Sequence, residues 1–260
     1  MGVHEVPGPM SVRIEQYRED EVAGVMQVGV TNHGDGLVAI ESVRIDWSGL
    51  AEPVAADLDY RLPADASVDL PVPVGRAECP SPYTGDPRSP QEPAQVTVGL
   101  AGGATVQTAV VDSSALARIY QAECRRRYLS DQVNLSFGDA WTLAGDASQT
   151  RAVGTMRLRR GDAAGPVAVT GVDGSVLLEL AVTGQPLPVV LADQRAEVEV
   201  PVEVRSTLRC DGHALGESKQ TFAFDVMVDL GQDGQALPFA LTPDHDGRAR
   251  MQEVIDAACG

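Results

Sequence analysis

The sequence predicts a mainly β protein: two tandem antiparallel β-sandwich domains, each closed by a C-terminal α-helix. Residues 68–74 and 198–204 match at an offset of 130, and both alternate apolar and polar residues. This period of two is typical of a strand with one buried face. A helical pattern recurs at an offset of 135. The strands are not separated by helices, which excludes Rossmann-type and TIM-barrel folds.

The repeat predicts the domain boundaries. We expect a tail at 1–8, a first domain at 9–128 with its closing helix at 113–127, and a second domain at 129–260 with its closing helix at 247–258. A chain of 260 residues is long enough for two such domains.

The first domain holds six predicted strands, at 11–17, 22–31, 37–47, 67–77, 94–101 and 104–111. The glycine-rich residues 32–36 predict a hairpin loop between the second and third of them. The second domain holds strands at 131–137, 151–160, 166–182, 195–209, 219–230 and 236–241. Short strands at this spacing are typical of an antiparallel sandwich.

Prolines qualify two parts of this prediction. Pro71 and Pro201 occupy the same position in the two repeated strands, which favours sheet edges or bulges for both. Residues 80–93 contain five prolines, so we expect a long loop there, the most mobile part of the fold.

Each closing helix is predicted from an apolar stripe. Leu116, Ile119, Tyr120 and Cys124 fall at positions i, i+3, i+4 and i+8, and the same spacings recur in Met251, Val254, Ile255 and Cys259. Residues at these spacings share one helix face. Asp112 and the pair Asp246-Gly247 precede the two stripes and are the expected N-caps.

The four cysteines occupy equivalent places in the repeats. Each repeat has one cysteine after the matching strand and one at the end of the closing helix, which predicts the disulfides Cys79–Cys124 and Cys210–Cys259. Each would contribute about 4 kcal/mol in the loop-entropy model. The alternative is four buried free thiols that pack as small hydrophobic groups.

Disulfides imply an oxidising compartment. Residues 1–10 show neither a basic region nor an apolar stretch, so no signal peptide or anchor is visible in this sequence. We expect an extracytoplasmic protein, secreted or held in the cell envelope. The alternative is a cytoplasmic protein with reduced thiols.

The charge of the chain restricts its partners. It holds 20 Lys+Arg against 37 Asp+Glu, a formal net charge of −17. Such an acidic surface repels phosphates, which argues against nucleic acid as a partner. No apolar run in the sequence approaches the ~18 residues of a transmembrane segment.

Three groups of residues are candidate sites. Arg125, Arg126 and Arg127, together with Arg157 and Arg159, would bind an anion or an acidic partner if they converged, because guanidinium groups bind carboxylates and phosphates in a bidentate geometry. The alternative is that nearby carboxylates pair with these arginines within the molecule.

The second candidate is a calcium site. Asp244, Asp246 and Glu253 match positions 3, 5 and 12 of an EF-hand loop, and Gly247 matches position 6. Thr242 stands where the first aspartate belongs, and a strand precedes the loop instead of a helix. The alternative is a capped helix start with a solvated glutamate. We expect no cofactor, and calcium would be one only if these carboxylates bound it.

The third candidate is Cys210 with His213, a Cys-x-x-His spacing that would hold a soft metal if the thiol were free. Motifs for serine hydrolases, zinc proteases and nucleotide-binding loops are absent from the sequence. We therefore expect no enzyme activity.

Two resemblances follow from particular residues. The short strands, the stretch from Gln27 to Gly34 and the paired cysteines resemble immunoglobulin or fibronectin-type-III-like sandwiches of bacterial envelopes. The stretch from Cys210 to Phe224 is similar to uncharacterised two-domain actinobacterial proteins. The first resemblance implies a fold and transfers no active site.

The sequence thus predicts a non-catalytic two-domain scaffold or protein-binding module at the bacterial cell surface, which presents loops or sheet edges to a protein partner. The alternative is an envelope protein that binds a small ligand, an anion or a divalent metal. An enzyme with an unrecognised site ranks last.

Overall fold

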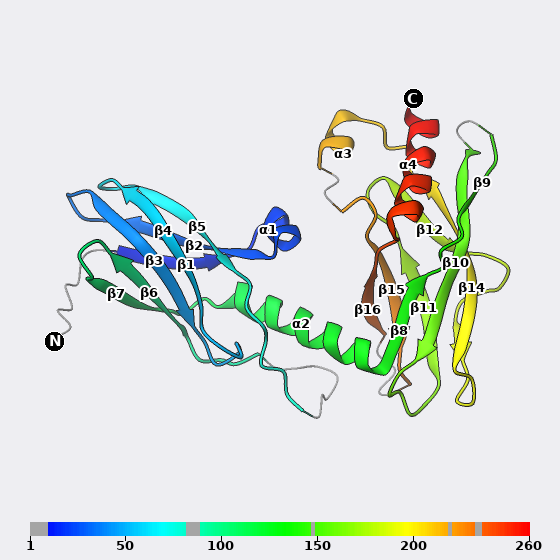
Figure 1. Cartoon of the computed structure of the whole chain (residues 1–260), viewed down its shortest axis with the longest axis horizontal. Coiled ribbons are helices and arrows are strands. Elements are labelled where there is room, and N and C mark those ends of the chain that lie inside the picture. The colour runs from blue at the N-terminus through cyan, green and yellow to red at the C-terminus, as the bar shows by residue number, and fades with distance from the viewer. Residues whose placement is uncertain (1–9, 82–88, 147–148, 218–219, 232–235) are drawn as a thin grey trace. The chain divides into compact units, whose positions relative to one another are not determined.

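The computed structural model describes residues 10–81, 89–146, 149–217, 220–231 and 236–260. Its backbone contacts divide the chain into unit 1, Met1–Arg125, and unit 2, Arg126–Gly260. Both units consist mainly of antiparallel strands (Figure 1). Part of the predicted 80–93 loop lies outside the described residues. The whole of the predicted 1–8 tail lies outside them.

Unit 1 is a sandwich of two antiparallel sheets. The first has the order β1-β2-β5 and the second the order β4-β3-β6-β7. The strands are β1 (Met10–Glu15), β2 (Val25–Asn32), β3 (Val38–Asp46), β4 (Val54–Leu62), β5 (Ser67–Pro73), β6 (Ala94–Leu100) and β7 (Thr105–Val110). Their inward-facing residues form one apolar core, in which Met26, Val28 and Ile45 are fully buried.

Unit 2 repeats the sandwich with more strands. One sheet has the order β12-β14-β10-β8, with β9 also paired to β10, and the other has the order β13-β11-β15-β16. The strands are β8 (Val133–Phe137), β9 (Thr142–Ala144), β10 (Arg151–Arg160), β11 (Val167–Asp173), β12 (Leu178–Val182), β13 (Val189–Leu191), β14 (Glu197–Ser206), β15 (Phe224–Asp229) and β16 (Leu237–Leu241). A second apolar core fills this unit.

The helices confirm the predicted stripes and correct their bounds. The four helices among the described residues are α1 (Arg18–Ala23), α2 (Ser114–Gln132), α3 (Gly212–Glu217) and α4 (His245–Cys259). The stripe from Leu116 to Cys124 packs into the core of unit 1, and Met251, Val254 and Ile255 pack into that of unit 2. We expected α2 to end at 127, but it runs on to Gln132, past the division between the units.

The caps differ from the prediction. Asp112 lies two residues before α2, and its Oδ1 accepts a hydrogen bond of 3.1 Å from the Ser114 backbone N–H. The N-cap of α4 is Asp244, whose Oδ1 accepts from the Gly247 N–H at 2.8 Å. Asp246 instead lies in the first helical turn, because α4 begins two residues before the predicted start.

The two prolines of the repeated strands, Pro71 and Pro201, occupy different positions in their sheets. β5 is an edge strand, as Pro71 predicts, but β14 lies between β10 and β12. Pro201 is tolerated there because the ladder with β12 ends beside it, and its carbonyl accepts from the Thr183 N–H at 2.9 Å. The missing donor therefore costs the sheet at most one terminal hydrogen bond.

Both predicted disulfides are formed. Cys79–Cys124 joins the segment after β5 to α2, and Cys210–Cys259 joins the segment after β14 to α4. The Cα atoms of each pair are 5.3 Å apart, an ordinary distance for a disulfide. Each bridge therefore attaches a closing helix to the strands of the same repeat.

Candidate functional site

A groove crosses one side of unit 1. Its volume is about 500 Å³, and it is lined by residues of β1, the end of β7 and the first turns of α2. We call it the β1–β7 groove, and its lining residues are Val12, Arg13, Ile14, Glu15, Gln16, Ala109, Val110, Val111, Asp112, Ser114, Ala115 and Arg118.

The groove lies where two sheet edges meet. β1 is the edge of the three-stranded sheet, and β7 is an edge of the four-stranded sheet. The two strands lie beside each other (Figure 1), but no ladder of hydrogen bonds joins them. Within the described part of the chain, β7 therefore pairs on one side only, with β6.

The register of the hairpin shows which backbone groups of β7 are unpaired. Leu100 N–H donates to the Ala104 carbonyl at 2.8 Å, which makes these two residues a hydrogen-bonded pair. In an antiparallel ladder such pairs alternate with pairs that are not hydrogen-bonded. The N–H and C=O groups of Thr105, Gln107 and Ala109 accordingly face away from β6, and all three residues are exposed.

β7 lacks the features that normally protect an edge. Natural edge strands are blunted by charged side chains or by proline. β1 carries Arg13 and Glu15, β4 carries Asp57 and Asp59, β12 carries Glu179, and β5 and β16 each contain proline. The edges β8 and β13 of unit 2 are also uncharged and without proline, but they are shorter, with five and three residues. β7, Thr-Val-Gln-Thr-Ala-Val, contains neither a charge nor a proline.

The groove has an apolar floor. Ile14, Val110 and Ala115 are each 5 % exposed or less, and Val12 is partly buried against the same core. Val111, by contrast, is 84 % exposed, the most exposed large apolar side chain in the described chain. A segment lying in this groove would therefore meet apolar groups beneath it and unpaired backbone groups at its side.

The charges at the rim are engaged with one another. Arg13 Nη2 lies 2.7 Å from Asp69 Oδ1, and Arg13 Nε lies 3.0 Å from Glu15 Oε1. The guanidinium lies over the backbone of Gly29, where an added Cβ would come within 2.5 Å of Arg13 Cζ. No larger residue at position 29 would leave this arginine in place.

Tyr17 extends the same cluster. Its hydroxyl donates to Asp69 Oδ2 at 3.1 Å. Hydrogen bonding to Glu15, and then to Asp69, raises the pKa of Tyr17. The phenol is therefore protonated and remains a hydrogen-bond donor at neutral pH.

Asp112 lies at the other end of the groove. The hydrogen bond from Ser114 N–H lowers the pKa of this carboxyl, and the charge of Arg118 lowers it further. The carboxylate and Arg118 thus offset each other beside the start of α2.

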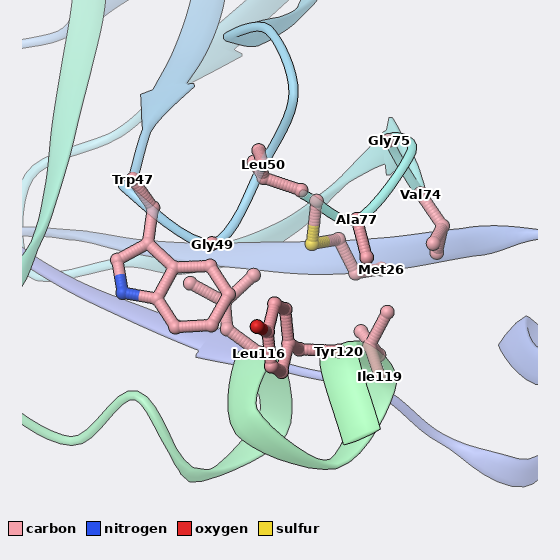
Figure 2. A pocket seen from close by; sticks show the side chains of 10 residues that line it. All are labelled: Met26, Trp47, Gly49, Leu50, Val74, Gly75, Ala77, Leu116, Ile119 and Tyr120. Atoms are coloured by element: carbon pink, nitrogen blue, oxygen red, sulfur yellow. The ribbon is translucent and has the colours of Figure 1, made fainter. Parts of the chain in front are cut away.

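A second cavity in unit 1 is structural. It lies between α2 and the segments that follow β3 and β5 (Figure 2), and its volume is about 10 Å³. Its lining is almost wholly apolar and includes Met26, Trp47, Leu50, Leu116 and Tyr120. The rings of Trp47 and Tyr120 meet edge to face at 5.8 Å. A cavity of this size holds one water molecule at most and no ligand.

The five arginines that the sequence singles out have different surroundings. Arg157 Nε lies 2.9 Å from Glu199 Oε1, and Arg159 Nε lies 3.2 Å from Glu197 Oε2, each pair crossing from β10 to β14. Arg157 and Arg159 therefore pair with carboxylates of the same molecule, which is the alternative given in the sequence analysis. Arg125 is half-buried in unit 1, and its Nε has no hydrogen-bond partner among the described residues. Arg126 and Arg127 belong to unit 2 and have interactions of their own.

The three carboxylates of the calcium hypothesis have separate partners. Asp244 caps α4, Asp246 Oδ1 lies 3.2 Å from His245 Nδ1, and Glu253 Oε1 accepts from Arg250 Nη1 at 2.7 Å. In the described ranges, no three His, Cys, Asp or Glu side chains are grouped so that they would hold a metal ion. The Cys210–His213 hypothesis is wrong, because the Cys210 sulfur is in a disulfide.

None of the three candidate sites suggested by the sequence includes the groove. The sequence predicts a strand at 104–111 and indicates no function for it. The available signal was the absence of charge from residues 93–111, a run of 19 residues that includes β7. The absence of charge indicates a binding edge only when the topology shows that β7 is an edge strand.

None of the helices in the described part of the chain is long and apolar enough to cross a membrane.

No family model matches the chain, and no curated protein matches it. The solved structures similar to it include the YadV chaperone, at 13 % identity and a TM-score of 0.23 over 89 % of this chain and 98 % of that one. The class 5 fimbriae chaperone CfaA is similar at 11 % identity and a TM-score of 0.21, over 90 % and 100 % of the two chains.

An enzyme gives a comparable match. The Amycolatopsis orientalis exo-chitosanase CsxA is similar at 15 % identity and a TM-score of 0.24, over 89 % of this chain and 26 % of that one. TM-scores this low carry no argument about function. The fold and the groove define the chain only as a two-domain β-sandwich protein with an unprotected sheet edge.

Proposed function

We propose that this chain is a non-catalytic, extracytoplasmic protein-binding module that receives an extended segment of a partner protein at the β1–β7 groove. The observation that supports this proposal is the uncharged, proline-free edge of β7. An extended segment that pairs with such an edge gains main-chain hydrogen bonds, and its side chains enter the adjoining groove. The two disulfides support the extracytoplasmic location, at a bacterial cell surface or in secreted form.

The groove suits a peptide segment better than a small molecule. It is open, and the end of β7, Ala109 and Val110, lines it on one side. Small-molecule sites are enclosed and place a few convergent polar groups around one ligand. At the β1–β7 groove the hydrogen-bonding groups instead belong to a strand edge: Ala109 lines the groove, and the unpaired backbone groups of Gln107 and Thr105 continue from it along β7.

The test is selection of peptides from a random phage-displayed library on the disulfide-bonded chain. Each enriched peptide is then measured against Ala109→Lys and Ala55→Lys. Both alanines are exposed, and they lie on the two opposite edges, β7 and β4, of one sheet. The two variants therefore add the same charge to equivalent positions.

We expect the enriched peptides to lose binding to Ala109→Lys and to keep it with Ala55→Lys. Failure to enrich any peptide, or equal binding to both variants, would contradict the proposal. Near-ultraviolet circular dichroism checks that both variants keep the native packing. Gln107→Lys, at another exposed position of β7, provides a second variant if Ala109→Lys does not fold.

A further inference from the structure

We infer that the segment received at the β1–β7 groove is a basic, amphipathic strand of a partner protein, with apolar residues at every second position. This inference rests on the proposed function and specifies the chemistry of the partner. It follows from three features of unit 1: the alternation along β7, the apolar floor of the groove and the balance of charge around it.

The alternation determines the pattern of the partner strand. Along β7, exposed Thr105, Gln107 and Ala109 alternate with the more buried Val106, Thr108 and Val110. Side chains directly opposite each other on paired strands lie on the same face of the sheet. A strand that pairs with β7 thus directs alternate side chains toward the core side and the others toward solvent.

The floor determines which of those side chains are apolar. The core side of the groove is formed by Val12, Ile14, Val110 and Ala115. Polar groups buried there would lose water and find no partner, which is unfavourable. The positions that face the floor therefore require apolar residues, and the positions that face solvent are open to polar or charged ones.

The charge balance favours a basic strand over an acidic one. β7 has no charge of its own, Arg13 is paired with Glu15 and Asp69, and Arg118 lies near Asp112. The local charges thus largely cancel. The field at the groove is then dominated by the rest of unit 1, which holds 18 Asp and Glu residues against 8 arginines, and it attracts cations and repels anions over a range limited by salt.

The same excess of acidic residues disfavours a second copy as the occupant. Two copies that pair through β7 would bring two strongly acidic molecules together. A basic segment meets the same uncharged edge and gains attraction from the surrounding field. The partner and a second copy therefore differ in the response of binding to salt, since screening weakens attraction and relieves repulsion.

The experiment uses three synthetic peptides of about the length of a typical strand. In the first, valine alternates with lysine and threonine. The second replaces each lysine by glutamate, and the third has the composition of the first with its valines consecutive. Binding of each peptide, labelled with fluorescein, is measured by anisotropy on the full disulfide-bonded chain at low and raised salt.

We expect the basic alternating peptide to bind, to weaken as salt rises, and to bind about tenfold or more tightly than the acidic peptide at low salt. The peptide with consecutive valines binds weakly because it cannot present one apolar face. Ala109→Lys loses binding of the basic alternating peptide, and Ala55→Lys, with the same added charge, retains it.

The contrary outcomes distinguish failure of the basic partner from failure of the proposed β7 site. Binding of the acidic peptide as tightly as the basic one overturns the basic partner, and the β7 edge remains the site if Ala109→Lys still abolishes binding. Equal loss or equal retention in the two lysine variants overturns both proposals. A wild-type dimer in sedimentation analysis that becomes a monomer in Ala109→Lys identifies a second copy as the occupant and also overturns this inference.

Discussion

Single side chains in both units depend on glycines that leave room for them. In unit 1, Gly29 accommodates the Arg13 guanidinium. In unit 2, Trp141 is 8 % exposed and contacts two glycines, since a Cβ at Gly154 would lie 2.7 Å from its Cε3 and a Cβ at Gly247 would lie 2.9 Å from its Nε1. Phe137 meets the same indole edge to face at 5.3 Å. The tryptophan is thus enclosed between β10 and the start of α4.

Gly154→Ala should destabilise the protein by about 1–3 kcal/mol, because the added methyl group overlaps the buried Trp141 ring, which cannot move without disturbing the core. Urea unfolding followed by tryptophan fluorescence measures the change. Gly165→Ala is the matched control in unit 2, since no atom lies within 4 Å of its added Cβ. Equal stability of the two variants would show that the core around Trp141 adapts freely.

At the scale of the element, the starts of helices and the pairing of strands depend on carboxylates. Asp112 accepts from Ser114 N–H at the start of α2, and Asp211 accepts from Ala214 N–H at 2.9 Å at the start of α3. In both cases the backbone hydrogen bond lowers the pKa of the carboxyl. On β10 and β14, glutamates pair with arginines of the facing strand.

Asp112→Ala should lower the melting temperature at neutral pH and have little effect in acid. The pKa of Asp112 is lower in the folded chain than its ordinary value of 3.8, so its stabilisation is present above that value and disappears as pH falls through the folded-state pKa. Melting curves of both proteins at neutral pH and well below pH 3.8 test this. A difference in melting temperature that persists in acid would assign the effect to something other than the charge.

Arg157→Glu should lower the melting temperature, because it places two carboxylates opposite each other on β10 and β14. Adding Glu199→Arg should restore most of the loss, since the reversed pair has the same geometry. Both side chains are substantially exposed, so raised salt should reduce the effect of the single change. If the double variant is no more stable than Arg157→Glu, the two residues are not coupled.

Sequence and structure agree most where the pattern is strong. The alternation in 68–74 and 198–204 correctly predicted strands, and the stripe that contains Leu116 and Tyr120 correctly predicted a buried helix face. The strand β4 was missed because its alternation uses alanine and leucine against two aspartates, which weakens the signal. The single strand expected at 166–182 is two strands in different sheets, separated at Gly174, where an added Cβ would lie 2.1 Å from the Leu178 carbonyl oxygen.

Less of the candidate site than of the fold could be predicted from the sequence. Repeat spacing placed the four cysteines in the right pairs because equivalent positions recur in both units. No comparable spacing links Ile14 to Val110, since the groove joins strands that are distant in the chain and belong to different sheets. Arg157 and Arg159 were candidate binding residues until the β10–β14 register placed Glu199 and Glu197 opposite them.

At the scale of the whole molecule, the two disulfides attach the closing helices to the strands and differ in exposure. In Cys79–Cys124 one cysteine, Cys124, is 1 % exposed and Cys79 is partly exposed, whereas Cys210 and Cys259 are both partly exposed. Thiolate reagents reach exposed disulfides more readily, because exchange requires access to a sulfur atom. The bridges should therefore respond differently to reductants.

Titration with dithiothreitol under native conditions should reduce Cys210–Cys259 before Cys79–Cys124. Peptide mapping after alkylation at each concentration identifies which thiols have been released. Replacing Cys79 and Cys124 together by serine should cost about 2–5 kcal/mol of stability. Reduction of both bridges at the same concentration would mean that global unfolding, rather than local access, controls the exchange.

The absence of charge from β7 has a consequence for the colloidal behaviour of the purified protein. Near its isoelectric point of about 4.5 the chain loses the repulsion that keeps its copies apart, while the edge of β7 stays unprotected. Turbidity on acidification should therefore depend on β7 more than on β1 and β4, the charged edges of the same unit. A single lysine at Ala109 would then extend the pH range in which the protein remains clear, whereas the same residue at Ala55 would not.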